Sequence, residues 1–115
     1  MIRLPAAKPS PRIESGVMRW YAGDTFSVTL VPELRDQDGE AVTIGVSDSL
    51  TVRFFDASHE PVHTFQFDGM TDGRAMMTFD GTVSAKFPKG AYYYDIVYTH
   101  GEKTTLARDN RAFVE

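Results

Sequence analysis

Hydrophobic and polar residues alternate along most of this chain, and the alternation is strongest between Phe87 and Tyr98. This segment reads FPKGAYYYDIVY, and a Pro-Lys-Gly turn leads into it. Successive side chains of a β-strand point to opposite faces. One face of the segment then carries Tyr92, Tyr94, Ile96 and Tyr98, and the other carries Ala91, Tyr93, Asp95 and Val97. Aromatic and β-branched residues suit a pleated, packed surface, so we predict the central strand of an antiparallel sandwich here.

Other segments alternate in the same way and are separated by turn signals such as Asp38-Gly39 and Asp80-Gly81. Strands are predicted at Val17–Tyr21, Thr25–Val31, Ser49–Phe55, Pro61–Phe67, Arg74–Phe79, Thr104–Arg108 and Arg111–Val114. The last of these is either a separate strand or a bulged continuation of the one before it. Ala41–Ile44 is a candidate short edge strand. No window longer than a turn keeps the 3.6-residue period of a helix.

These strands predict an all-β fold, namely an immunoglobulin-like antiparallel β-sandwich of about 7–9 strands. The order Gly90, Tyr92, Tyr94 is similar to the tyrosine corner of such folds, in which a phenol hydroxyl bonds to the backbone. We therefore assign these three residues to a structural corner.

The length of 115 residues predicts one domain, over residues 16–115. Residues 1–15 have prolines at positions 5, 9 and 11 and little apolar content, so an extended or disordered N-terminal arm is expected. The alternatives are an untethered terminus and an arm that orders against a neighbouring subunit. The N-terminus has no apolar segment typical of a secretory signal, and no apolar run is long enough to cross a bilayer.

Composition excludes several classes of chemistry. There is no cysteine, so disulfides, thiolate zinc sites and a thiol nucleophile are absent. The net charge is −4 and the twelve lysines and arginines are scattered, which argues against nucleic acid as a partner.

No catalytic or metal-binding constellation stands out. His59 and His63 are separated by a turn and Pro61, so they are not expected to share a metal, and His100 is expected to be solvated. The acidic stretch from Asp36 to Glu40 lacks the later ligands of an EF-hand and is read as a hairpin turn. No nucleophile elbow and no phosphate-binding glycine loop occur. We therefore predict no catalytic residue, no metal and no cofactor.

Exposed aromatic residues are the candidate binding surface. If Tyr92 and Tyr94 face the core, Tyr93 and Val97 must face outward. Aromatic residues are enriched at the cores of interfaces, although most aromatic residues of a small domain belong to its interior. The candidate interface or ligand residues are Trp20, Tyr21, Tyr93 and Val97.

Across about residues 17–115 the chain resembles small immunoglobulin-like structural proteins of phages and prophages of Gram-positive bacteria. The likeness is to the N-terminal domain of upper baseplate proteins. It rests on Ala22-Gly23-Asp24-Thr25, on the GAYYYDIV sequence of residues 90–97, and on the closing Arg111–Val114. It does not extend to the long coiled or receptor-linked continuation of a full baseplate subunit. The resemblance implies a virion or assembly component and no catalytic residues.

The resemblance makes a non-enzymatic structural or adaptor protein of the tail or baseplate region the first hypothesis. Such a protein would bind other virion proteins or itself, as a homo-oligomer, and would be found in the bacterial cytoplasm during assembly and then in the virion. The alternative is a carbohydrate- or cell-surface-binding module, in which Trp20 and Tyr93 would contact a glycan. A small hydrolase is the third reading.

Overall fold

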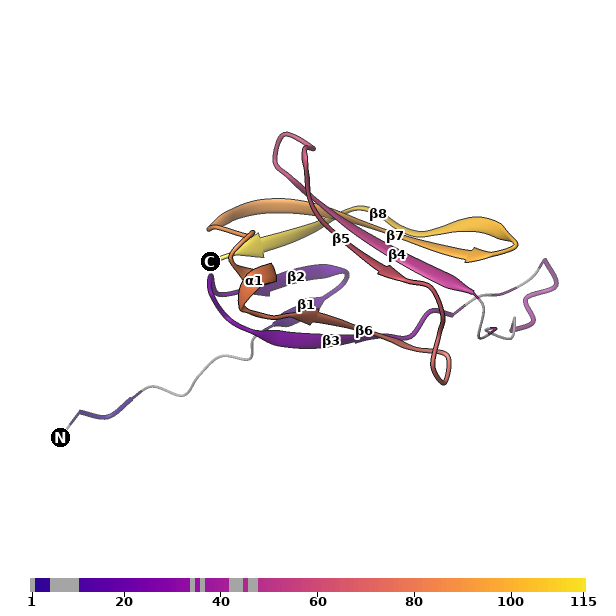
Figure 1. Ribbon diagram of the computed structural model, residues 1–115, viewed down its shortest axis with the longest axis horizontal. Coiled ribbons are helices and arrows are strands. Elements are labelled where there is room, and N and C mark those ends of the chain that lie inside the picture. The colour runs from indigo at the N-terminus through magenta and orange to yellow at the C-terminus, as the bar shows by residue number, and fades with distance from the viewer. Residues whose placement is uncertain (1, 5–10, 34, 36, 42–44, 46–47) are drawn as a thin grey trace.

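The computed structural model describes residues 2–4, 11–33, 35, 37–41, 45 and 48–115. These residues form eight strands and one short helix (Figure 1). The elements are β1 (Arg12–Glu14), β2 (Val17–Trp20), β3 (Phe26–Leu30), β4 (Ser49–Asp56), β5 (Pro61–Phe67), β6 (Ala75–Phe79), α1 (Gly81–Ser84), β7 (Gly90–His100) and β8 (Glu102–Val114). The predicted all-β class is confirmed.

The strands form a six-stranded sheet in the order β1-β2-β8-β7-β4-β5 and a two-stranded sheet of β3 and β6. The smaller sheet covers one face of the larger, which gives a sandwich-like arrangement (Figure 1). The expectation of a purely antiparallel structure is wrong at one pair, because β2 and β8 run parallel. After β2 the chain crosses to the smaller sheet, where it forms β3, so β2 and β3 do not form a hairpin. Within the larger sheet, β2 pairs instead with the C-terminal end of β8.

The core lies between the two sheets and is mostly aromatic. Trp20 is fully buried, and its ring centroid lies 5.2 Å from that of Phe79 and 5.6 Å from that of Phe87. Phe54 meets Trp20, Phe79 and Phe87 edge-on. Tilted and edge-to-face contacts at these distances are the favoured geometry of aromatic rings, and they add to the effect of burying apolar area.

Strand β7 confirms the predicted central strand, since it lies between β8 and β4. The side chains of Tyr92, Tyr94 and Tyr98 are buried, as the alternation predicts. The Tyr92 hydroxyl donates to the carbonyl of Pro88 at 2.5 Å, across the turn that precedes Gly90. The Tyr94 hydroxyl donates to the carbonyl of Gly16, in the β1–β2 turn. Tyr92 thereby links β7 to the turn just before it, and Tyr94 links β7 to a turn that is distant in sequence.

The turn between β1 and β2 explains why a glycine stands at position 16. Ser15 and Gly16 both have positive φ, at 50° and 78°, as a two-residue type I′ hairpin requires. A Cβ atom on Gly16 would also lie 2.8 Å from Nδ2 of Asn110.

The sheet begins inside the predicted N-terminal arm. Arg12–Glu14 is expected there from the sequence, whereas it forms β1 and pairs with β2.

Two local features add detail to the predicted pattern. The Asp80-Gly81 turn opens α1, and the Asp80 side chain caps it by accepting from the backbone N–H of Val83 at 2.9 Å. Of the two alternatives for Arg111–Val114, the structure shows the bulged continuation, so β8 is one continuous strand with a bulge near Asp109. Asp109 has a φ of 53°, and its N–H donates to the Asp95 carboxylate at 2.9 Å. Ala41 makes an isolated bridge with Arg35, and the rest of the candidate strand at 41–44 lies outside the described residues.

The hydrogen bond between Tyr92 and Pro88 makes a prediction about stability. Tyr92→Phe removes the donor and leaves the ring in place, so the free energy of unfolding should fall by about 1 kcal/mol. Urea denaturation of the two proteins measures the difference. Tyr21→Phe is the matched control, because Tyr21 lies at the surface and its hydroxyl has no hydrogen bond among the described residues. Equal losses in both variants would contradict a specific role for the Tyr92 hydroxyl.

Candidate functional site

The sequence-predicted surface residues do not all lie at the surface. Trp20 has no exposed area, so its assignment to an interface or ligand surface is wrong. In β2 the side chains of Met18 and Trp20 point into the core, and Arg19 points out. Local alternation identifies the two faces of such a strand but cannot tell which face another sheet covers. Tyr21 is 36% exposed and lies just after β2, with the Arg12 guanidinium 5.8 Å from its ring centroid.

Tyr93 lies half-buried on the outer face of the six-stranded sheet, between a side chain of the neighbouring strand β8 and one from the turn that follows its other neighbour, β4. On the β8 side, Arg111 is its cross-strand partner, and the guanidinium carbon is 4.6 Å from the phenol centroid. On the β4 side, the imidazole of His59 stacks on the phenol, with the ring centroids 4.5 Å apart and an angle of 14° between the ring planes. Stacked cations and imidazoles of this kind hold an aromatic side chain in one orientation.

The contacts continue from Tyr93 towards β2. The Arg111 guanidinium is also 5.2 Å from the Phe113 ring centroid, and Arg19 covers the same ring at 4.5 Å. We call Arg19, Tyr93, Arg111 and Phe113 the arginine–aromatic patch. Neither of its guanidinium groups forms an ion pair with another described residue, so two positive charges face outward from a chain whose net charge is negative.

Val97 lies on the same outer face, four residues beyond Tyr93 on β7. It borders a shallow hollow of about 190 Å³ whose other walls are Thr51, Arg53, Thr99 and Lys103. Four strand residues span about 13 Å, so Val97 and the patch are separate parts of one surface. Of the four predicted residues, the structure brings Tyr93 and Val97 to one face, leaves Tyr21 at an edge and buries Trp20.

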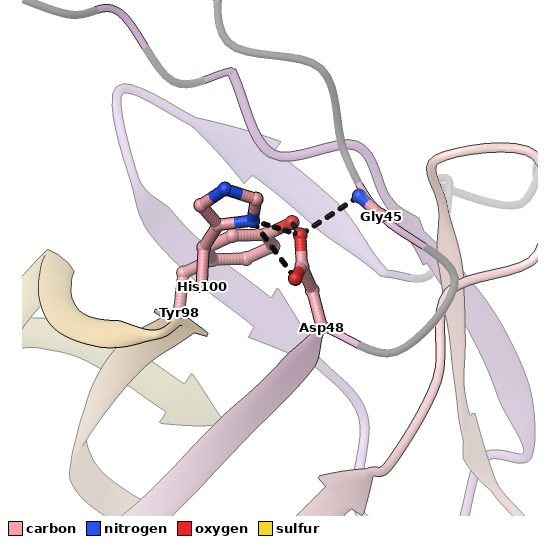
Figure 2. A network of polar contacts seen from close by, with 4 residues as sticks. All are labelled: Gly45, Asp48, Tyr98 and His100. Carbon is pink, nitrogen blue, oxygen red and sulfur yellow. Dashed lines mark hydrogen bonds and ion pairs between the residues drawn. The ribbon is translucent and has the colours of Figure 1, made fainter.

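A polar cluster that the sequence does not predict joins the start of β4 to the end of β7 (Figure 2). The buried carboxylate of Asp48 accepts from the Tyr98 hydroxyl and, at 2.8 Å, from the backbone N–H of Gly45. Nδ1 of His100 lies 2.8 Å from both carboxylate oxygens, so this nitrogen carries a proton and donates. His100 is half exposed, but it is not simply solvated as predicted. Asp48 lies about fifty residues from both partners, and no local pattern signals the contact.

The surroundings of Asp48 change its acidity and that of Tyr98. The Tyr98 hydrogen bond, followed by the bonds from Gly45 and His100, lowers the pKa of Asp48 below 3.8, although burial opposes this. Burial, together with the neighbouring carboxylate, raises the pKa of Tyr98 well above 10. A carboxylate at Nδ1 of a histidine also occurs in catalytic triads. Within the described residues, however, no hydroxyl group hydrogen-bonds to Nε2 of His100, and the contacts observed are those of a structural link.

The remaining histidines lie in different surroundings. His63 packs edge-on against Phe65, and its Nδ1 is 3.3 Å from Nζ of Lys86. Burial, and then the charge of Lys86, lower the pKa of His63. The His59 ring stacks on Tyr93, and its Nε2 lies 3.9 Å from Oδ1 of Asp109. His59 and His63 therefore have different neighbours and do not face a common site. Asp36 lies outside the described residues, and those that are described include no cluster of three His, Asp or Glu side chains suited to a metal ion.

Comparison with family models, with curated proteins and with solved structures gave no significant match. In the part of the chain that the structure describes, no helix has the length and apolar character needed to span a membrane.

The Asp48 cluster predicts how stability depends on acidity. Because the folded-state pKa of Asp48 lies below its ordinary value of 3.8, the ionised group stabilises the fold above about pH 4. This stabilisation is lost as the pH falls through the folded-state pKa. Tyr98→Phe removes the main cause of the low pKa, so the loss should begin at a higher pH.

Carbon-13 NMR titration of the Asp48 carboxyl group measures the pKa directly, and urea midpoints between pH 7 and pH 2 report its effect on stability. Tyr93→Phe is the control, because it removes a phenol hydroxyl for which no hydrogen bond is described, on the outer face. An Asp48 pKa that stays the same in Tyr98→Phe would show that the hydroxyl does not stabilise the carboxylate.

Proposed function

We propose that this protein is an immunoglobulin-like β-sandwich that acts without catalysis, as a structural or adaptor component of a phage or prophage virion. In this proposal it works in the tail or baseplate region and associates with other virion proteins or with its own copies. Two kinds of observation support the proposal. One is the fold with its corner, together with the family resemblance of residues 22–25, 90–97 and 111–114. The other is the outer face of the large sheet.

The strand arrangement supports the immunoglobulin-like part of the proposal. In such folds two sheets pack face to face, and a tyrosine near the start of one strand bonds to backbone a few residues upstream. Tyr92 stands two residues into β7, and its hydroxyl reaches Pro88, four residues before it. The short helix α1 lies in the connection between the two sheets, just before this corner.

The arginine–aromatic patch is the observation that carries the proposed mode of action. Arginine and tyrosine are enriched among the residues that contribute most to protein–protein binding, because they combine apolar area with directed hydrogen bonds. Tyr93 is held by Arg111 and His59, so little side-chain freedom would be lost on binding. The guanidinium groups of Arg19 and Arg111, which form no ion pair with another described residue, favour a partner whose facing surface is acidic.

The alternative, a carbohydrate-binding module, requires ring faces that are free to stack on sugars. Trp20 is buried and offers none. Tyr93 has a guanidinium on the side of one neighbouring strand and an imidazole on the side of the other. The structure therefore favours association with proteins over binding of glycans.

Co-sedimentation with particles tests the proposal. The strain that carries the coding region is induced, and particles are separated on a density gradient. Wild-type chain should be found with them. Arg111→Glu should weaken binding by about 30-fold or more, since truncating a central interface arginine costs about 2 kcal/mol.

Arg108→Glu is the matched control, because Arg108 is an exposed arginine on the same strand and lies outside the patch. Circular dichroism confirms that both variants fold. If wild-type chain stays at the top of the gradient while particles form, the proposed role is wrong. If Arg108→Glu and Arg111→Glu behave alike, the patch is not the binding surface.

A further inference from the structure

The small sheet has an edge that no described strand covers. Strand β6 pairs with β3 along its whole length, from Ala75 to Phe79, and with no other described strand. An unpaired strand edge presents a row of backbone N–H and C=O groups, and an extended segment of another chain can pair with them.

A largely apolar hollow adjoins the beginning of this edge. It has a volume of about 350 Å³. Its walls come from Thr29 on β3, Phe67 at the end of β5, Ala75 and Met76 on β6, and the loop between β5 and β6. Met76, the second residue of β6, is 60% exposed, which is unusual for a methionine within a strand. The hollow is large enough for aliphatic side chains.

The N-terminal residues have the complementary pattern. Ile2 and Leu4 are 88% and 86% exposed, and they are separated by Arg3. In a strand, residues two apart point to the same face, so Ile2 and Leu4 would enter the hollow together and Arg3 would face away. Pro5 cannot donate to a ladder, so the pairing segment would end at Leu4.

Position favours a second copy as the source of this segment, and its charge is opposite to that of the rest of the chain. Residues 1–12 carry Arg3, Lys8 and Arg12 and no carboxylate, whereas residues 13–115 carry nine lysines and arginines against sixteen carboxylates. Residues 2–4 lie at one end of the molecule, and the loop between β5 and β6 lies towards the other end (Figure 1). The segment of one copy is therefore placed to reach the edge of the next.

We propose that residues 2–4 of one copy add a short strand to a neighbouring copy, at the edge of β6 that no described strand covers, with Ile2 and Leu4 in the hollow beside Met76. The contact joins two different surfaces, so it is head-to-tail and generates a ring or an open row of copies. This inference rests on the proposed role in assembly and names one of its interfaces.

Disulfide trapping tests the contact, because the chain has no cysteine of its own. Full-length Leu4→Cys and Met76→Cys proteins are mixed and oxidised with copper phenanthroline. The mixed disulfide dimer should form on the order of tenfold more than in the control mixture, since bound thiols have a millimolar effective concentration. The control replaces Met76→Cys by Leu106→Cys, because Leu106 is an exposed apolar residue on β8 of the large sheet. Light scattering should also show a lower oligomer mass for the Ile2→Asp/Leu4→Asp protein than for wild type.

Equal trapping in the two mixtures, or an unchanged oligomer mass in Ile2→Asp/Leu4→Asp, would overturn this inference. A Leu4→Cys/Met76→Cys double variant that gives only a cross-linked monomer would also overturn it, since the segment would then bind its own copy. Co-sedimentation of wild-type chain with particles is measured separately. If disulfide trapping fails while co-sedimentation is intact, only the proposed contact of residues 2–4 is wrong. If trapping succeeds while co-sedimentation fails, only the proposed role in the virion is wrong.

Discussion

Three phenol hydroxyl groups on the inner face of β7 hold three connections of this fold in place. Tyr92 bonds to the corner at Pro88, Tyr94 to the β1–β2 turn at Gly16, and Tyr98 to Asp48 before β4. A strand fixes the spacing of its alternate side chains, so these three anchor points are set by a single element. Each hydroxyl would otherwise be buried without a partner, at a cost of about 1–3 kcal/mol. The core and the loops are therefore positioned by the same residues.

The same strand also supplies the candidate binding surface, because its alternate residues face the other way. Tyr93 stands between Arg111 and His59 on the outside, one residue from buried Tyr92 and Tyr94. The inner bonds fix the backbone of β7, and this holds the outer side chains at a constant position over the sheet. Rigid support of this kind favours binding, because it reduces the freedom lost when a partner docks.

The sequence predicts the strands well wherever alternation is regular, as in β4, β5 and β7. It fails where the result depends on which elements meet. Trp20 alternates correctly, but only the position of the second sheet decides that its face is the inner one. Asp48 contacts Tyr98 and His100, which are about fifty residues further along the chain, and no local sequence pattern around these residues indicates the contact. The arginine–aromatic patch likewise could not be predicted without knowing how β2 and β7 align with β8. The outward direction of Tyr93, in contrast, follows from the alternation of its own strand.

The parallel pairing of β2 with β8 determines how the domain would respond to a pulling force. Tension applied along the chain through Arg12 and Glu115 would first peel β1 from β2, one pair of residues at a time, because that hairpin is antiparallel. The load would then reach β2 and β8, which lie side by side and would be drawn in opposite directions along their axes. Their hydrogen bonds would bear this shear together rather than in succession. The pairing of β2 with β8 is therefore the mechanically resistant part of the molecule.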